Sequence, residues 1–344
     1  MRLFFFIVLL GMLLACKQEE KNADKYINIS GHTMGTNYAI QYKDSLQRNF
    51  KTELDSLLKL VNRSMSTYDP KSVISTFNNS RASVFEVDSH FANVFEISKK
   101  LFALTDGYFN PTVFPLVKYW GFAGGAKPEN PDSVIVDSLL QLCDFNALQL
   151  IDSSNSHFIY RSRENITLDF SAVAKGYGVD LLSQFLENNS IENYLIEIGG
   201  EVRFNGINPN NDKWSVGIDD PTSELENRKL IAILKDRNSA IATSGNYRNY
   251  YERKGKLYAH ILNPRTGYSE QSSILSATVV AENCAEADAL ATALMINGKQ
   301  LFDKISKDEV LKKSYKILLI ESGENQLQPV FSNELEDNLN WLKE

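Results

Sequence analysis

Cysteine and histidine are scarce in this 344-residue chain, which has three of the first and four of the second. Three cysteines cannot build a disulfide framework. Cys143 and Cys284 leave two interpretations open, a pair in an oxidising compartment or two buried thiols. Positively charged residues are fewer than negatively charged ones: the chain has 36 Lys and Arg residues and 43 Asp and Glu residues, which gives a formal net charge of −7. An acidic chain argues against nucleic acid as a partner.

Long apolar runs are absent after the N-terminus, where no stretch approaches the roughly 18 apolar residues of a membrane-spanning helix. The N-terminus itself reads MRLFFFIVLLGMLLAC, with one arginine, a short apolar run, Ala15 and Cys16. This composition predicts a secretory signal peptide over residues 1–15. The polar stretch that follows predicts a flexible tether over residues 16–27. We expect one folded unit over residues 28–340.

The predicted elements mix strands and helices without a regular alternation. Alternation of polar and apolar residues predicts strands at 36–42, 194–198, 214–218, 231–234, 258–262 and 275–281. Helical periodicity predicts helices at 46–63, 90–105, 133–142, 176–188, 285–297 and 300–306. Several strands follow one another through polar turns, among them NPNNDK (208–213), which predicts a hairpin turn. This order favours an α+β fold with mainly antiparallel pairing over a doubly wound parallel sheet.

One alanine-rich segment, ADALATALMI (287–296), carries an acid and a hydroxyl at helical spacing. Asp288 and Thr292 are one turn apart, so a helix places them on the same face. Two interpretations stay open: the face is simply exposed to water, or a charged ligand such as a metal ion lies against it. Carboxylate and hydroxyl oxygens are hard ligands of the kind that Mg²⁺ takes.

Two glycine-containing segments predict a close approach of the backbone to a ligand or a neighbour. In LDFSAVAKGYGVD (168–180), an extended run leads through Asp169 and small residues to Lys175 and a helix. Such a helix start can bind a phosphate. A solvated lysine is the alternative, and the glycine spacing excludes a Walker-type loop. In IEIGGEVRFNG (196–206), the pair Gly199–Gly200 ends a strand and predicts a sharp turn.

His260 is the histidine that the pattern places in a strand leading into a turn. In LYAHILNPRTGY (257–268), we expect it to share a strand face with Tyr258 and Leu262. There it is either a general base that the strand holds in place or a structural histidine. The aromatic residues of DGYFNPTVFPLVKYWGF (106–122) likewise suit a hydrophobic core or a wall for a flat ring.

Taken in order, these segments resemble the ApbE family of FAD:protein FMN transferases, whose members are often exported lipoproteins. The resemblance runs from about residue 30 to residue 300, nearly the whole chain after the signal. It is carried by the motifs MGT (34–36), STYDPKSVISTFN (66–78), DGYFNPT (106–112), DFSAVAKGYGVD (169–180), IGGE (198–201), TSGNY (243–247), HILNPRTG (260–267) and ADALATAL (287–294). It implies an ApbE-like α+β unit.

The resemblance implies a Mg²⁺-dependent enzyme that binds FAD as its substrate and moves the FMN half onto a Ser or Thr of another protein. It assigns the metal to a carbonyl of Ala172 and to the side chains of Asp288 and Thr292. It assigns the catalytic base to His260. It assigns the FAD contacts to Met34, Tyr68, Tyr108, Phe109, Asn110, Asp169, Lys175 and Leu262.

Two positions depart from the family pattern, which commonly has Asp where this chain has Asn110 and Asn263. Asn loses the charge but keeps a hydrogen-bonding oxygen. Neither position belongs to the implied metal ligands or to the base, so the assignment stands.

The sequence Leu-Leu-Ala-Cys at residues 13–16 resembles the lipobox of bacterial lipoproteins, in which cleavage precedes a cysteine that is then acylated. It implies a lipid anchor on Cys16 that holds the protein on a membrane of the bacterial cell envelope, facing the periplasm. The alternative is an ordinary signal peptide with a chance cysteine.

The family implies as acceptors the flavoprotein subunits of Rnf-type electron-transport complexes and of sodium-pumping NADH:quinone reductases. Two other functions stay open at this point. One is a Mg²⁺-dependent FAD pyrophosphatase, which uses water as the nucleophile and releases FMN and AMP. The other is a flavin-binding lipoprotein without catalysis, although a carrier needs neither a metal nor a base.

Overall fold

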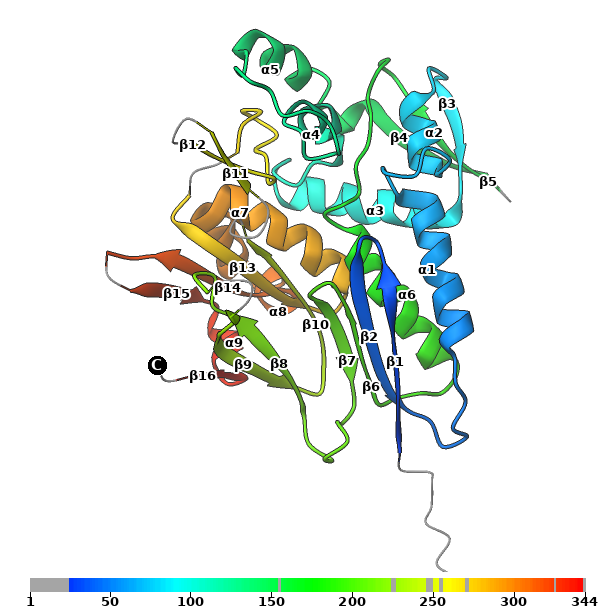
Figure 1. Cartoon of the computed structure of the whole chain (residues 1–344), viewed down its shortest axis with the longest axis vertical. Coiled ribbons are helices and arrows are strands. Elements are labelled where there is room, and N and C mark those ends of the chain that lie inside the picture. Colours follow the sequence, from blue (N-terminus) through cyan, green and yellow to red (C-terminus); the bar gives the residue numbers. More distant parts are fainter. Residues whose placement is uncertain are drawn as a thin grey trace, which may run out of the picture.

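An eight-stranded antiparallel sheet runs through the middle of the molecule, in the order β1-β2-β6-β7-β10-β13-β14-β15 (Figure 1). Its strands are β1 (Tyr26–Thr33), β2 (Thr36–Lys43), β6 (Tyr194–Ile198), β7 (Glu201–Asn205), β10 (Asn238–Gly245), β13 (Ile274–Ala281), β14 (Lys316–Ser322) and β15 (Leu327–Phe331). The computed structural model describes residues 25–342 without 154–155, 224–226, 246–249, 254–255, 270–271 and 325. The predicted signal peptide and Cys16 therefore lie outside the described residues.

The sheet begins earlier in the chain than the predicted folded unit. Tyr26 and Ile27, expected at the end of the tether, pair with Lys43 and Tyr42 of β2. The ring of Tyr26 also packs edge-on against Trp214, with 6.0 Å between the ring centroids. Burying part of an aromatic ring favours the sheet over a solvated tether. The prediction of a tether is therefore wrong for residues 26 and 27.

The middle strands of the large sheet are buried on both faces. In β10, Ile241 and Ala242 follow each other but belong to different hydrophobic clusters. In β14, Leu318 and Leu319 divide between the same two clusters. Because successive side chains of a strand point to opposite faces, a core lies on each side of these strands.

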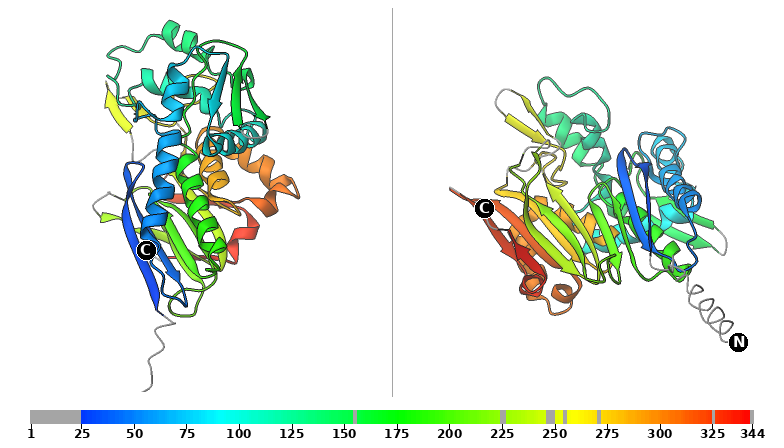
Figure 2. Two further views of the ribbon diagram at one scale, coloured as in Figure 1. Left: turned by 90° about the vertical axis from the view of Figure 1, so that its right-hand side faces the viewer. Right: turned by 60° about the horizontal axis from the view of Figure 1, so that its bottom comes forward.

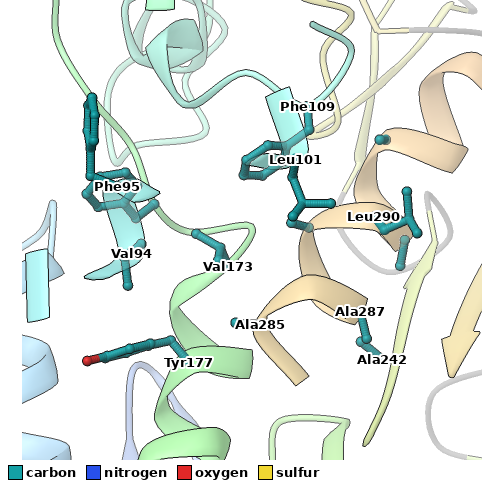
Figure 3. Packing of buried hydrophobic residues seen from close by; sticks show 14 of the residues in the cluster. Val94, Phe95, Leu101, Phe109, Val173, Tyr177, Ala242, Ala285, Ala287 and Leu290 are labelled. Carbon is teal, nitrogen blue, oxygen red and sulfur yellow. The ribbon is translucent and has the colours of Figure 1, made fainter. Parts of the chain in front are cut away.

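Helices α1 (Lys51–Met65), α6 (Ala174–Asn188) and α7 (Cys284–Lys307) pack against one face of the sheet. α7 lies along β10 and β13, and α6 lies along β6 and β7. Figure 3 shows Tyr177 of α6 and Ala285 of α7 where the first turns of these two helices meet. The contact is close, because a Cβ on Gly176 would lie 2.4 Å from the carbonyl oxygen of Cys284.

A second sheet of three strands packs on the opposite face, in the order β16-β9-β8. Its strands are β8 (Trp214–Asp219), β9 (Leu230–Asp236) and β16 (Leu339–Trp341). Trp214 and Ile218 share a hydrophobic cluster with Phe204 of β7. The predicted hairpin at residues 208–213 is wrong, because this turn links β7, which pairs with β6 and β10, to β8, which pairs with β9.

Most of the remaining elements lie beyond the upper end of the large sheet in Figure 1, as the side view of Figure 2 also shows. They are the sheet of β3 (Val84–Val87), β5 (Ser156–Arg161) and β4 (Leu148–Ser153), the hairpin of β11 (Tyr250–Arg253) and β12 (Lys256–Ala259), and the helices α2 (Val73–Asn79), α3 (Ser89–Leu104), α4 (Phe114–Tyr119) and α5 (Ser133–Leu140). Two short helices, α8 (Leu311–Ser314) and α9 (Asn333–Glu336), accompany the C-terminal strands. No helix within the described ranges has the length and apolar character needed to cross a membrane.

The predicted α+β class with antiparallel pairing is confirmed, and β6 matches its predicted range. The last two predicted helices form one element, α7, which is kinked at Gly298, where φ is 41°. The predicted strand 258–262 is wrong in its second half. β12 ends at Ala259, and Leu262 forms only an isolated bridge to Ser269, because the chain turns back on itself between these two residues.

Cys143 and Cys284 are both free thiols, so the interpretation as a disulfide pair is wrong. Cys284 is fully buried at the start of α7, and burial raises the pKa of its thiol. Cys143 is partly buried, and burial raises the pKa of its thiol to about 12. At neutral pH both side chains are therefore protonated and act as small apolar groups.

Candidate active site

A cavity of about 980 Å³ opens where the large sheet, α6, α7 and the elements above them meet. All the residues that the sequence assigns to a site line this cavity: Met34, Tyr68, Tyr108, Phe109, Asn110, Asp169, Ala172, Lys175, His260, Leu262, Asp288 and Thr292. They come from both ends and the middle of the chain, so only the folded structure brings them together. Their individual roles stay predictions.

Three charged side chains, which we call the Lys175 cluster, form part of the cavity wall: Lys175, Glu201 and Asp288. Lys175 Nζ lies 2.6 Å from Glu201 Oε1 and 3.8 Å from Asp288 Oδ1. Asp288 Oδ2 accepts the backbone N–H of Gly176 at 3.1 Å. Glu201 Oε2 is buried and has no hydrogen-bond partner in the described structure. One ammonium therefore neutralises two carboxylates only in part, and the alternative of a merely solvated Lys175 is wrong.

Burial and charge shift the pKa values of the Lys175 cluster. Burial raises the pKa of Glu201 to about 7, although the nearby Lys175 acts in the opposite direction. Burial also raises the pKa of Asp288. For Lys175, burial lowers the pKa, but the charges of Asp288 and Glu201 outweigh it and the net shift is upward. All three pKa values are raised, so each group holds its proton more tightly than an isolated side chain would. The cluster therefore favours binding of a further proton or cation.

The side chains near Asp288 fit a hard divalent cation. Asp288 provides a buried carboxylate, and Thr292, one turn along α7, has its hydroxyl 3.2 Å from Ser244 Oγ. Ala172 lies in the turn before α6 and lines the same cavity. Across the residues that the structure describes, no group of three His, Cys, Asp or Glu side chains could hold a metal. A site here would combine one carboxylate with neutral oxygens and water, as Mg²⁺ sites often do, and it would add positive charge to a cluster in which one ammonium faces two carboxylates.

Two tight turns bring the backbone to the cavity. Met34 and Gly35 join β1 to β2 with φ values of 49° and 73°. These values suit a two-residue hairpin turn but are uncommon for a side chain as large as Met. Gly199 and Gly200 join β6 to β7 with φ values of 62° and 108°, which confirms the predicted sharp turn. A Cβ on Gly199 would lie 2.7 Å from Cγ2 of Thr36, so glycine is required there.

His260 lies in an irregular segment directly after β12 and not within a strand. Its side chain is half-buried and lines the cavity. Its ring meets the ring of Phe122 edge-on, with 6.4 Å between the centroids. Phe122 in turn contacts the ring of Tyr251 in β11 at 5.5 Å. Aromatic packing from the loop after α4 therefore takes the place of the strand that the sequence predicts as the support of His260.

The aromatic residues assigned to the site differ in their surroundings. Tyr68 is 72% exposed at the cavity. Phe109 is buried and lies beside Leu101 of α3 in the core (Figure 3). Tyr108 is half-buried, with the guanidinium of Arg265 4.1 Å from its ring centroid and Arg265 Nη1 3.2 Å from its hydroxyl. The interpretation of this segment as core is thus correct for Phe109. The interpretation as a wall for a flat ring stays a prediction for Tyr108, which lines the cavity.

The two asparagines that depart from the family pattern hold turns beside the cavity. Asn110 Oδ1 accepts hydrogen bonds from the backbone N–H of Thr112 at 2.9 Å and from its hydroxyl at 2.6 Å. Asn110 Nδ2 donates to the carbonyl of Cys143 at 3.2 Å. Asn263 Oδ1 accepts the backbone N–H of Arg265 at 2.8 Å. An Asp could accept at both positions, but it could not donate to Cys143.

Asp169 and Leu262 complete the set of predicted residues. Asp169 Oδ1 accepts the backbone N–H of Ser171 at 2.8 Å, and its own N–H donates to the carbonyl of Pro111 at 2.8 Å. Burial raises the pKa of Asp169. Leu262 is buried in a small cluster with Trp120. Both residues fix the course of the backbone at the cavity.

Among the lining residues that were not predicted, Glu201, Ser244 and Phe122 contact predicted ones, namely Lys175, Thr292 and His260. The IGGE motif contains a signal for Glu201, an acid directly after a two-glycine turn. The TSGNY motif contains Ser244, whose contact with Thr292 depends on the pairing of β10 with its neighbours. Phe122 is one aromatic residue among many in its segment, and no local signal marks it.

Comparison with known proteins identifies the family of the chain. The model of the ApbE family matches residues 34–312. The FAD:protein FMN transferase of Vibrio cholerae is 37% identical over 303 residues, which cover 86% of this chain and 88% of the relative. The FAD:protein FMN transferase of Haemophilus influenzae is 34% identical and covers 83% of this chain and 84% of the relative.

Comparison with solved structures identifies the same family. The flavin transferase ApbE from Vibrio cholerae superposes with a TM-score of 0.80 at 31% identity, over 91% of this chain and 99% of that one. The apo form of the flavinyl transferase ApbE from Pseudomonas stutzeri has a TM-score of 0.79 at 26% identity, over 91% and 96%. Because sequence and fold agree over most of the chain, this chain belongs to the ApbE family.

Proposed function

We propose that this chain is a Mg²⁺-dependent FAD:protein FMN transferase. It attaches the FMN half of FAD through a phosphoester bond to a Ser or Thr hydroxyl of an acceptor protein. The hydroxyl oxygen forms a bond to the phosphorus of the FMN half, the phosphoanhydride bond to that phosphorus breaks, and AMP leaves. The proton of the hydroxyl passes to His260.

The observation that carries this proposal is the gathering of all the predicted site residues in one cavity of about 980 Å³. This cavity joins an aromatic residue such as Tyr108, which suits a flavin ring, to the Lys175 cluster, which would suit a diphosphate once Mg²⁺ compensates its second carboxylate. The names of the relatives from Vibrio cholerae and Haemophilus influenzae support the same activity.

The residues of the cavity have different roles in this reaction, according to their chemistry. Lys175 supplies a positive charge for the diphosphate of FAD. His260 is half-buried at the cavity and accepts the proton of the incoming hydroxyl. Asp288, Thr292 and the carbonyl of Ala172 would hold Mg²⁺. When bound, Mg²⁺ would polarise the phosphate oxygens and compensate the negative charge of the leaving AMP.

Incubation of the purified protein with FAD, Mg²⁺ and an acceptor domain, followed by intact-mass measurement, tests the proposal. We expect the acceptor to gain one FMN group and AMP to appear in equal amount, with neither product formed in EDTA. An acceptor whose Ser or Thr is replaced by Ala is the control. Free FMN and AMP without a modified acceptor would instead identify an FAD pyrophosphatase, and FAD binding without turnover would identify a carrier.

We propose as acceptors the flavoprotein subunits of Rnf-type complexes and of sodium-pumping NADH:quinone reductases. We further propose that acylated Cys16 anchors the protein to a membrane of the bacterial cell envelope. The Leu-Leu-Ala-Cys sequence and the polar residues after it support this anchor. Anchoring would keep the enzyme on the same membrane as acceptors that are themselves parts of membrane complexes.

A further inference from the structure

The small sheet ends in an open strand at the cavity. β8 is the last strand in the order β16-β9-β8, and within the described ranges it pairs with β9 alone. Val216, Gly217 and Asp219 of β8 line the cavity. The free edge of β8 therefore leads into the same space as His260.

The hydrogen bonds of β9 show which residues of β8 point outward. On the side of β16, Lys235 N–H donates to the carbonyl of Asn338, and Leu342 N–H donates to the carbonyl of Ile231. In an antiparallel strand, the backbone groups of successive residues point to opposite sides. The odd-numbered residues of β9 therefore face β16, and the even-numbered residues face β8.

The same alternation then continues into β8. Val216 and Ile218 lie opposite even-numbered residues of β9, so their backbone groups point toward β9. Ser215 and Gly217 point their N–H and C=O groups toward the open side. Both residues are exposed to solvent. The regular edge ends at the register shift between Ile218 and Asp219, beside the cavity.

Before the register shift at Ile218, this edge lacks two common protections of an edge strand, proline and lysine. Natural edge strands often carry a Pro or Lys that prevents pairing with another chain. The residues Trp214–Asp219 contain neither. By contrast β15, at the end of the large sheet, contains Pro329 within its paired segment. The exposed backbone of β8 is thus able to accept a further strand.

We propose that the open edge of β8 is the docking site for the acceptor protein. An extended segment of the acceptor pairs with Ser215 and Gly217 as a fourth strand and thereby delivers its hydroxyl to His260. This inference rests on the proposed function and names how the protein substrate is recognised. Backbone pairing explains how one enzyme can serve acceptors of different sequence, because it reads an extended backbone and leaves selectivity to a few side chains.

A matched pair of variants at Ser215 tests this docking. Ser215→Pro removes the outward N–H of the edge, whereas Ser215→Ala keeps it and removes only the hydroxyl. Pro is tolerated in an edge strand when its N–H side faces solvent. We expect Ser215→Pro to lower kcat/KM for transfer to the soluble flavin-carrying domain of an Rnf-type subunit by about tenfold or more, mainly through KM. Ser215→Ala should transfer like the wild type, and both should bind FAD with unchanged affinity.

Modified substrates provide a second test on the unmodified enzyme, which remains decisive if Ser215→Pro does not fold. Synthetic peptides that carry the acceptor threonine are N-methylated at one amide at a time. We expect the loss of transfer to follow a period of two along the peptide, because only every second amide faces the edge of β8. Equal transfer to all peptides, or a loss without this period, would overturn the proposal.

The remaining outcomes separate this inference from the proposed function. If the wild type modifies no acceptor, the proposed function fails. If the wild type modifies the acceptor and Ser215→Pro does so equally well, only the docking site fails. The alternative occupant of the edge is a second copy of this chain, and light scattering tests for it. If the wild type is a dimer and Ser215→Pro is a monomer, acceptor docking at this edge is overturned.

Discussion

The carboxylate of Glu201 holds the ammonium of Lys175, with 2.6 Å between Oε1 and Nζ. The second oxygen of Glu201 is buried without a hydrogen-bond partner in the described part of the chain. Because Asp288 Oδ1 also lies 3.8 Å from Lys175 Nζ, removing the charge of any one residue of the cluster changes the electrostatic environment of the other two.

Glu201→Gln should make the stability of the metal-free protein less dependent on pH. Burial raises the pKa of Glu201 from 4.5 to about 7, so between these values the folded state binds more protons than the unfolded state. Stability contributed by this group is therefore lost as the pH rises from about 4.5 to about 7. Urea unfolding in EDTA across this range should give a flatter curve for the variant. Glu129→Gln, in an exposed loop, is the control, and identical slopes for wild type and Glu201→Gln would contradict the prediction.

Asp288→Ala should abolish Mg²⁺-dependent transfer and leave the protein folded. The variant removes the carboxylate on which the metal site depends, and a metal contributes several kcal/mol to phosphoryl transfer, so a loss of at least about a hundredfold is expected. Ala is a good helix former, and Lys175 retains Glu201 as a partner. Transfer assays across a Mg²⁺ titration, with circular dichroism to check folding, measure both effects. Undiminished Mg²⁺-dependent transfer would remove Asp288 from the metal site.

His260→Ala should bind FAD nearly as well as the wild type and transfer FMN at least about a hundredfold more slowly, the lower range of general-base effects. A group that accepts the hydroxyl proton acts in the transition state, so its loss lowers kcat more than affinity. Phe122→Leu, which removes the ring packed against His260 and Tyr251, should transfer FMN at a rate between those of the wild type and His260→Ala. Single-turnover transfer and FAD titration on the same samples give the comparison. Parallel losses of affinity and melting temperature would indicate a structural histidine instead.

Gly176→Ala should destabilise the protein by about 1–3 kcal/mol, although alanine is the better helix former. The new Cβ would lie 2.4 Å from the carbonyl oxygen of Cys284, and backbone cannot move away as a side chain can. Gly178→Ala in the same helix is the matched control, because its Cβ would meet the ends of flexible side chains at 3.0 Å or more. Chemical denaturation of both variants measures the difference. Equal stability of the two would refute the backbone clash.

Cys16→Ser should release the protein from the membrane or leave it unprocessed. Acyl chains contribute about 0.8 kcal/mol for each buried methylene, and more than one chain gives stable anchoring. Detergent phase partition of wild type and variant is the measurement. Recovery of the wild type entirely in the aqueous phase would show that Cys16 carries no lipid.

The sequence was most informative where its composition favours one kind of element. The helix with Asp288 and Thr292 could be predicted because alanine and leucine are strong helix formers, although most residues of its first half are buried. Strands β10 and β14 could not, because both their faces are buried and the alternation of polar and apolar residues disappears.

Only some residues of the candidate site could be predicted from the sequence. Residues in recurring motifs, such as Lys175 and His260, could be assigned through the family resemblance. Glu201 could not, because its importance comes from contacts with Lys175 and Asp288, which lie far away in the sequence. The prediction that a strand holds His260 was also wrong. The ring of Phe122 packs edge-on against His260 instead, and such a contact leaves no periodic pattern in the sequence.

The cavity takes Met34 from the first hairpin and Thr292 from α7, near the two ends of the matched family region. A growing polypeptide therefore has no binding site until α7 has been synthesised and has packed against α6. No ligand of this cavity can assist the earlier stages of folding, and a prematurely terminated product cannot retain one. Occupancy of the cavity thus distinguishes molecules that contain α7 from shorter products.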